Sequence, residues 1–346
     1  MGSRRRSSRK KSRSGVATLF SGILVLAVLA AGAAGWLILT PFGPSGETLV
    51  QIPPGSSTMR VARQLEEAGV LRSRYEFYVL RWVRRGVLKA GVYKFDHPAP
   101  ASEIYSRIAR GDVYTIALTV PEGANIFDIA ARVQQAGLGS KQDFLQAAMT
   151  NTSLVADFDP RAKSLEGYLF PDTYRFSPPV SAEQMAAAMV RQFRIAAEQI
   201  GLKENVHEVV TLASLVEHET ALEAERPLVA SVYANRLEKK MALAADPTII
   251  YGLELEGRYR GTIYESDLQS DMAYNTYRHA GLPPGPIGNP GLPSLKAALH
   301  PAQTDYLYFV AAGNNPQGHS LFSATLDEQI RNVAEYRKAM RQAGAR

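Results

Sequence analysis

Residues 206–220 read Val-His-Glu-Val-Val-Thr-Leu-Ala-Ser-Leu-Val-Glu-His-Glu-Thr. At about 100° per residue, the apolar side chains of this segment cover a broad arc, which predicts a helix that is largely buried. Glu219 and Glu217 lie on opposite borders of that arc, about 200° apart in projection. A carboxyl group among leucines at the end of a buried helix loses hydration, which raises its pKa and suits it to donate a proton as a general acid.

The same glutamates have a structural interpretation, in which they are solvated and pair with nearby arginines, as Glu223 could pair with Arg226. A zinc protease of the H-E-x-x-H type is excluded because Leu222 stands where that pattern needs its second histidine. The sequence has no G-x-S-x-G elbow, phosphate-binding loop or dinucleotide fingerprint, and without cysteine it has no thiol catalysis, thiolate metal site or disulfide. We therefore expect chemistry without a metal or a cofactor.

The positive charge of the chain is concentrated at its N-terminus. Of the 39 lysines and arginines, seven lie in the first thirteen residues, which contain no acidic residue. The remainder of the chain is nearly neutral, with 32 basic and 33 acidic residues. Because no aromatic residue is interleaved with the basic run and no nucleic-acid-binding module accompanies it, we expect residues 1–15 to be a cytoplasmic tail and expect no nucleic-acid partner.

Residues 16–40 carry no formal charge and predict a transmembrane helix. As a helix, these 25 residues extend about 37 Å, enough to cross a hydrocarbon core of about 30 Å with some tilt. Since basic residues precede the segment and none lies between Trp36 and Glu47, the positive-inside rule predicts a single-pass protein of the cytoplasmic (inner) membrane with its N-terminus inside. A cleavable signal peptide ending near Ala31-Gly32-Ala33 is the alternative, but the apolar run continues to Leu39.

After a linker at residues 41–47, residues 48–115 predict a small subdomain. Its pattern is strand, helix, helix, strand, with these elements expected at 49–52, from Thr58 to a cap at Gly69, around 75–82, and at 91–95. For the second helix the i, i+3, i+4, i+7 spacing predicts an apolar face made of Tyr75, Tyr78, Val79 and Trp82. This β-α-α-β order resembles a LysM module, a unit that binds glycans containing N-acetylglucosamine.

The first strand-turn-helix unit has an internal echo at an offset of 68 residues. Five positions are identical in the two copies, namely Pro53/Pro121, Gly55/Gly123, Ala62/Ala130, Ala68/Ala136 and Gly69/Gly137. This predicts a second β-turn-α unit. Strand, turn, helix and glycine cap also recur in many unrelated α/β proteins, which is the simpler explanation of the match.

Residues 116–346 predict a mainly helical, mixed domain, so that the fold class of the chain is α+β. Helices are expected from about residues 206, 227, 247 and 326, with a Gly/Pro-rich loop at 281–293 and a strand at 306–310. The stretch from Glu166 to Tyr174 is too aromatic and too interrupted for an ordinary helix.

Six ordered segments resemble the successive motifs of the YceG-like endolytic murein transglycosylase family. They are Ala213–Thr220, Asn235–Leu237, Asp246–Thr248, Ala273–Tyr277, Gly281–Ile287 and Ala297–Pro301. With the Glu166–Tyr174 stretch and the N-terminal anchor, the resemblance covers nearly the whole chain. It implies a membrane-bound lytic transglycosylase in which anchor, LysM-like subdomain and catalytic domain follow one another. The sequence departs from the family pattern at His218, where lysine is usual, and at Ala244, where many relatives have glutamine.

The resemblance also implies roles for individual residues. Glu219 matches the second glutamate of the family's E-K-E-T motif, which is its catalytic acid. Glu217 matches the first, and joins Tyr274, Asn275 and Tyr277 as candidates for substrate contact. The two tyrosines and the amide would form a sugar-facing wall, with the aromatic faces against the sugar ring and the amide at the N-acetyl group. A polar turn that packs its own rings is the structural alternative.

The implied reaction cleaves the β-1,4 bond between N-acetylmuramic acid and N-acetylglucosamine without water. Glu219 would protonate the bond oxygen and then take the proton of the muramyl C6 hydroxyl, which closes on C1 to leave a 1,6-anhydro end. A hydrolytic muramidase using Asp246 or Asp271 as a second carboxylate, and a non-catalytic wall-binding scaffold, are the alternatives. A role in cell wall biogenesis and glycan strand termination implies peptidoglycan strands and cell-wall synthases as partners.

Overall fold

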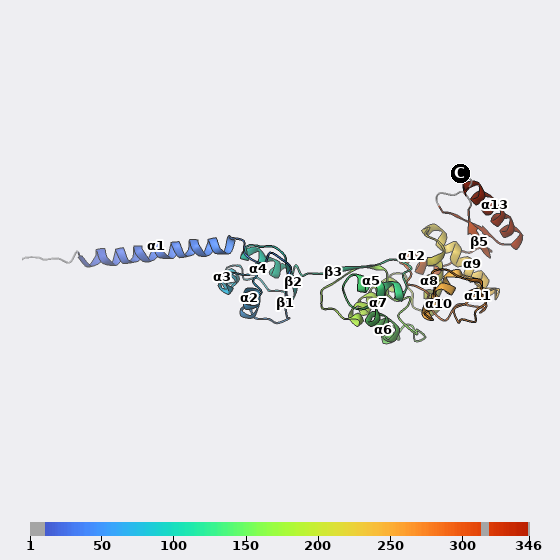
Figure 1. Ribbon diagram of the computed structural model, residues 1–346, viewed down its shortest axis with the longest axis horizontal. Helices are drawn as coiled ribbons and strands as arrows, with labels where there is room; N and C mark the ends of the chain where they lie inside the picture. Colours follow the sequence, from blue (N-terminus) through green and yellow to red (C-terminus); the bar gives the residue numbers. More distant parts are fainter. Residues whose placement is uncertain (1–10, 313–317, 345–346) are drawn as a thin grey trace, which may run out of the picture. The chain divides into compact units, whose positions relative to one another are not determined.

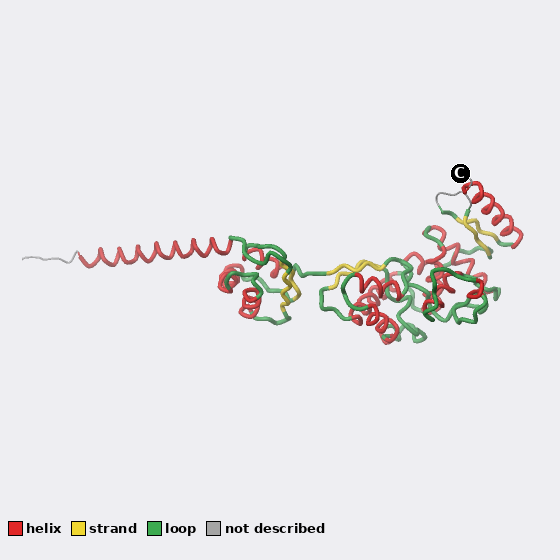
Figure 2. Tube along the Cα trace, viewed as in Figure 1, coloured by secondary structure: helices red, strands yellow, loops and turns green. Residues whose placement is uncertain are grey.

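The computed structural model describes residues 11–312 and 318–344. The chain divides into two compact units, residues 1–115 and 116–346 (Figure 1). The described residues form thirteen α-helices and three two-stranded antiparallel sheets, joined by loops (Figure 2). The α+β class is therefore confirmed. Most of the predicted basic tail, residues 1–10, lies outside the described residues.

The first unit begins with a long apolar helix, α1 (Lys11–Leu39). Its section from Thr18 to Leu39 has a mean hydropathy of 2.4 and is long and apolar enough to cross a membrane. Most side chains of this section are exposed, but Ala34, Leu37 and Ile38 near its end are partly covered, and Ile38 packs against the core of the unit. The end of α1 is thus attached to the folded part of the unit by side-chain contacts as well as by the chain.

The remainder of the first unit is a two-stranded sheet packed with three helices. In chain order its elements are β1 (Thr48–Ile52), α2 (Thr58–Glu67), α3 (Arg74–Arg84), β2 (Gly91–Phe95) and α4 (Ala101–Arg110). β1 and β2 pair antiparallel with Val50 opposite Tyr93, and both side chains enter a core shared with α2 and α4. The predicted β-α-α-β order is found. The additional helix α4 was not predicted, and it supplies Ile104 and Ile108 to that core.

The apolar face predicted for α3 is not the side of the helix that is buried. The helix buries Phe77 and Leu80, and the Phe77 ring lies 5.2 Å from the ring of Tyr105 on α4. Of the predicted apolar face, Tyr75 and Trp82 are exposed, whereas Tyr78 is partly buried against the core. The helix has apolar residues on two sides, so its spacing alone could not decide which side meets the core.

The strand-turn-helix echo is reproduced in three dimensions by β3 (Ile116–Val120) and α5 (Ile126–Gln135). The N-caps of α2 and α5 are Ser57 and Asn125, and each side chain accepts a backbone N–H of the first turn. Gly69 and Gly137 follow the two helices with φ of +69° and +71°, the left-handed conformation that favours glycine. The copies differ in their partner strand, because β3 pairs with β4 (Asp172–Phe176), which lies beyond two further helical segments.

The second unit is mainly helical, with α8 in its core. After β3 and α5 its elements are α6 (Lys141–Thr150), a 3-10 turn (Thr152–Leu154), β4, α7 (Ala182–Gln199), α8 (Val206–Glu219), a second 3-10 turn (Glu223–Glu225), α9 (Arg226–Glu238), α10 (Asp246–Leu255), α11 (Glu265–Leu268), α12 (Leu292–Leu299), β5 (Tyr308–Ala311), β6 (Ser320–Ser323) and α13 (Leu326–Gly344). α8 packs against α9, α10 and α12, and every residue from Val210 to Val216 is buried. The prediction of a largely buried helix here is confirmed.

Two loops meet the first half of α8 at a point where only glycine fits. Gly167 has a left-handed φ of +87°, and a Cβ built on it would lie 2.5 Å from Cγ of Pro286 and 2.7 Å from Cγ1 of Val210. Pro286 belongs to the loop before α12 and Val210 to α8. Close packing at Gly167 therefore fixes both loops against the central helix.

Replacing this glycine tests that arrangement. Gly167→Ala combines the left-handed strain of about 1–2 kcal/mol with an overpacking cost of about 1–3 kcal/mol, so the midpoint of thermal unfolding should fall clearly. Gly137→Ala is the matched control, because its φ is +71° but nothing lies within 4 Å of its added Cβ. Equal shifts in the two variants, measured by circular dichroism, would contradict the packing argument.

Candidate active site

Glu219 is the last residue of α8. The helix ends there because Thr220 adopts an extended conformation, with φ of −145° and ψ of 134°. The hydroxyl of Thr220 accepts a hydrogen bond from the amide of Leu222 at 3.1 Å and so stabilises the turn that follows. The side chain of Glu219 is thereby presented at a helix end, beside α9 and the start of α10.

The carboxyl group of Glu219 has a raised pKa. Burial is the main cause, and the negative charge of Asp246 acts in the same direction. The hydroxyl of Tyr233, a buried residue of α9, donates to Oε1 of Glu219 at 2.5 Å, which together with the charge of Arg236 offsets part of the increase. The acid form of Glu219 therefore persists to a higher pH than that of an exposed glutamate.

Tyr277 is brought to the same place by its contact with Asp246. Its hydroxyl donates to Oδ1 of Asp246 at 2.6 Å, and burial raises its pKa, with the charges of Asp246 and Glu219 adding to the effect. Tyr277 keeps 40% of its surface exposed. Arg236 is fixed nearby, since its guanidinium donates to the backbone oxygens of Leu307 and Leu243. A half-buried acid, an exposed carboxylate, a partly exposed tyrosine ring and a fixed cation are thus brought together.

The side chains of the other two residues of the expected sugar-facing wall, Asn275 and Tyr274, make contacts inside the protein. Asn275 is fully buried, and its amide nitrogen donates to the backbone oxygens of Leu268 and Ser270 at 3.0 and 2.6 Å. Its amide therefore holds the turn and has no exposed surface for an N-acetyl group, which corrects the expectation for this residue. The ring of Tyr274 packs edge-on against Tyr251 at 5.1 Å. For these two residues the alternative of a turn that packs its own side chains describes the structure better.

Glu217 has a structural environment. Its side chain is 5% exposed, and Oε1 pairs with Arg226 at 2.8 Å while Oε2 accepts the backbone N–H of Gly291 at 2.8 Å. These contacts connect the end of α8 with the start of α9 and the residue before α12. Arg226 also reaches Glu122 at 3.4 Å. The suggested partner of Glu223 thus pairs with two other glutamates.

Glu166 is a buried acid for which no role was predicted. Burial raises its pKa to about 8. Its Oε2 accepts the backbone N–H of Ile126 at 3.0 Å, and its Oε1 accepts Nδ2 of Asn289 at 2.9 Å. Asn289 also donates to the backbone oxygen of Ala124, so the pair joins the 165–169 loop to the start of α5 and to the loop before α12. Only the apolar neighbours of Glu166 in the sequence hinted at this burial.

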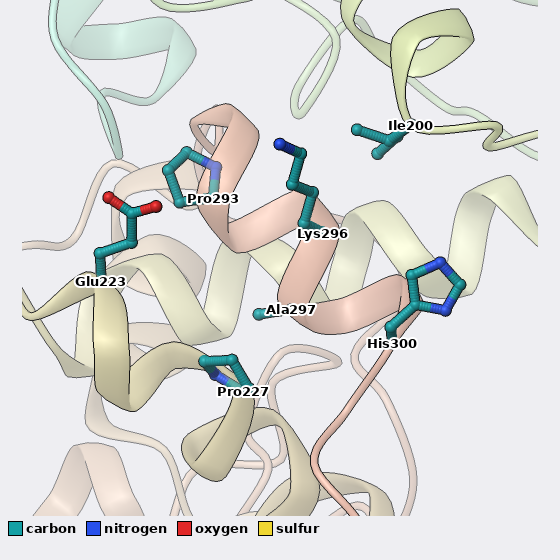
Figure 3. Close-up of a pocket in the computed structure, with 7 residues that line it drawn as sticks. All are labelled: Ile200, Glu223, Pro227, Pro293, Lys296, Ala297 and His300. Atoms are coloured by element: carbon teal, nitrogen blue, oxygen red, sulfur yellow. The ribbon is translucent and has the colours of Figure 1, made fainter.

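A cavity beside these helices is lined by residues other than Glu219. A cavity of about 410 Å³ lies between α12 and the α8–α9 connection, and Figure 3 shows the side chains of Glu223, Lys296 and His300 around it. Its remaining lining residues are Ile200, Pro227, Pro293 and Ala297. Within residues 11–312 and 318–344, no group of three or more His, Asp or Glu side chains is placed to hold a metal ion.

Comparison with known proteins gives the relationship of the whole chain. The YceG-like family model matches residues 50–335, which is most of the sequence. The chain belongs to the YceG-like family. Among similar family members, the endolytic murein transglycosylase of Bacillus subtilis is 35% identical over 325 residues, covering 87% of this chain and 89% of the relative.

A second relative and a solved structure extend the comparison. The endolytic murein transglycosylase of Streptococcus pneumoniae strain R6 is 30% identical over 321 residues, covering 83% of this chain and 58% of the relative. The crystal structure of a YceG-like protein from Listeria monocytogenes is 32% identical, has a TM-score of 0.53, and covers 83% of this chain and 99% of that one. The family assignment thus rests on sequence and fold together.

The environment of Glu219 predicts opposite pKa changes in two variants. Tyr233→Phe removes the hydrogen bond that stabilises the carboxylate, so the pKa of Glu219 should rise. Asp246→Asn removes a negative charge that disfavours the carboxylate, so the pKa should fall. Difference infrared spectroscopy during a pH titration measures both, with Glu219→Gln identifying the carboxyl band. Shifts of the same sign in both variants would contradict this account.

Proposed function

We propose that this chain is an endolytic murein transglycosylase with Glu219 as its catalytic acid. The main support is the environment of Glu219, which matches the catalytic acid in the motif of the family. Glu219 is the last residue of a buried helix, and burial raises its pKa. A group that keeps its proton toward neutral pH can donate it to a leaving oxygen. The name shared by the two curated relatives supports peptidoglycan as the substrate.

The proposed reaction uses this one carboxyl group twice. Glu219 first donates its proton to the oxygen that joins C1 of N-acetylmuramic acid to N-acetylglucosamine, and the C1–O bond breaks. The resulting carboxylate then takes the proton of the muramyl C6 hydroxyl while O6 forms a bond to C1. Glu219 is protonated again at the end, no water is consumed, and the product carries a 1,6-anhydro ring. The nucleophile belongs to the substrate, so its high effective concentration replaces a positioned water.

The placement of the other carboxylates supports the lytic reaction over hydrolysis. Asp271 is 86% exposed and pairs with His279, and Asp246 is exposed at the start of α10, where Tyr277 donates to it. We assign Asp246 the role of raising the pKa of Glu219. Tyr277, with its exposed ring beside these acids, is our candidate for contact with the sugar, and Glu217 is assigned to the support of α8.

The first unit supports a proposal about location. We propose that α1 crosses the cytoplasmic membrane once with the N-terminus inside, as the seven basic residues before it favour. Residues 48–115 would then be a LysM-like, glycan-binding subdomain and residues 116–346 the catalytic domain, both outside the cytoplasm. There the enzyme would terminate glycan strands during wall biogenesis beside the synthases that make them.

Glu217 and Glu219, near the end of α8, should respond to substitution in different ways. Glu219→Gln keeps the size of the side chain but removes the titrating proton, so cleavage of glycan strands should fall by about 10²- to 10⁴-fold while the protein stays folded. Glu217→Gln should lower the unfolding midpoint, because it removes the charge that pairs with buried Arg226, and should leave more activity. Similar activity losses in both variants, with similar unfolding midpoints, would contradict the assignment.

The product distinguishes the proposed reaction from the muramidase alternative. Full-length protein in detergent, incubated with uncrosslinked glycan strands, should release fragments that are lighter by one water than hydrolytic products, with internal cuts before disaccharides accumulate. Strands with O-acetylated muramyl C6 hydroxyls should resist cleavage because the nucleophile is blocked. In labelled water, mass spectrometry should find no oxygen-18 at C1. Reducing ends that carry the label, together with inactivity of Asp246→Asn, would establish hydrolysis instead.

A further inference from the structure

The outer side of α3 carries an apolar stripe that is not used by the core. The α3 stripe consists of Tyr75, Val79, Trp82 and Val83, at i, i+4, i+7 and i+8. Their exposed fractions are 69%, 42%, 76% and 63%. The helix already buries Phe77 and Leu80 on its other side. A row of exposed aromatic and β-branched side chains beside a completed core is typical of a surface that contacts something else.

The stripe is continuous with the end of α1. Tyr75 and Val79 line a cavity of about 190 Å³ together with Ala34, Leu37 and Ile38 of α1. α3 and α4 both contact α1, and Figure 1 shows them beside its C-terminal end. If α1 crosses the membrane, as proposed above, its last turns mark the outer boundary of the hydrocarbon. The stripe therefore begins at that boundary.

The charges around the stripe fit a lipid surface. Residues 72–85 contain five arginines, and their one acidic residue, Glu76, is buried. Arg84 and Arg85 are exposed at the end of α3, next to Trp82 and Val83. Tyrosine and tryptophan rings prefer the headgroup level of a bilayer, and arginines there can bind lipid phosphates. A soluble protein partner would not account for the continuity with an apolar membrane helix.

We propose that the α3 stripe lies in the outer headgroup region of the membrane that α1 crosses, with the exposed Arg84 and Arg85 at the end of α3 on anionic lipid phosphates. This inference rests on the proposed membrane anchoring. Its consequence is that the first unit is held on the bilayer surface in a fixed orientation and does not swing freely on a linker.

The chain allows a direct test because Trp36 and Trp82 are its two tryptophans. Full-length Trp36→Phe protein, reconstituted in phosphatidylcholine vesicles with and without phosphatidylglycerol, reports on Trp82 alone. We expect blue-shifted Trp82 emission, protection from iodide, and stronger quenching by lipids brominated near the carbonyl than by lipids brominated near the chain end. Quenching should increase with phosphatidylglycerol at low salt, and should not change on adding inorganic phosphate at the same ionic strength. Independence from the anionic lipid would overturn the role of the arginines.

Two controls separate the possible failures. Trp82→Phe leaves Trp36, which lies within α1 and should be quenched by brominated lipid if the anchor is in the bilayer. If Trp36 is quenched but Trp82 is not, the anchor stands and the stripe proposal fails. If neither is quenched, the anchor fails and the proposal fails with it.

Leu49→Trp in a chain lacking both native tryptophans places the probe at an exposed position on β1, which should remain accessible to iodide. Trp82 protected from iodide but not quenched by lipid would show a protein cover, such as a second copy, and would also overturn the proposal.

Discussion

The ion pair between Glu217 and Arg226 holds the last turn of α8 in place. Both side chains are nearly inaccessible, and the second oxygen of Glu217 also accepts the amide of Gly291. α8, α9 and the start of α12 are therefore tied together on one side of the helix. The direction of the Glu219 side chain, two residues later, depends on this fixed turn. On the other side of the helix, the hydroxyl of Tyr233 donates to the carboxyl group of Glu219. Glu217 and the proposed catalytic acid Glu219 thus lie on opposite borders of one helix end.

The degree of enclosure distinguishes Glu219 from Glu166, two acids of the second unit whose pKa is raised by burial. Glu219 is held by one hydroxyl at a helix end, next to the exposed side chains of Asp246 and Tyr277. Glu166 is enclosed and bonded to the Ile126 amide and to Asn289. Both carboxyl groups lose hydration, but only the first lies beside residues that a large polymer could reach. An elevated pKa identifies a catalytic acid only when the geometry also admits a substrate.

The order and spacing of neighbouring residues predicted the features that depend on short stretches of the chain. The arc of α8, the opposite directions of Glu217 and Glu219, and the repeated strand-turn-helix unit all follow from residues close together in the chain. The features that were missed depend on distant partners. Asn289 lies 123 residues from Glu166, and the face of α3 that packs inward is chosen by Tyr105, on a helix not anticipated. Asn275 looked like a ligand for a sugar because its sequence could not show that the neighbouring carbonyls already occupy its amide.

The burial of Glu166 makes the free energy of unfolding of the second unit depend on pH. In an unfolded chain this carboxyl group loses its proton near pH 4.5, whereas in the folded protein it does so near pH 8. Between these values the folded form retains a proton that the unfolded form has released. Its contribution to stability is thus fully present below about pH 4.5 and is lost as the pH rises through about 8. Above about pH 8 the carboxyl group is ionised in an interior that disfavours its charge, so an alkaline medium would destabilise the place where the start of α5 and the loop before α12 meet.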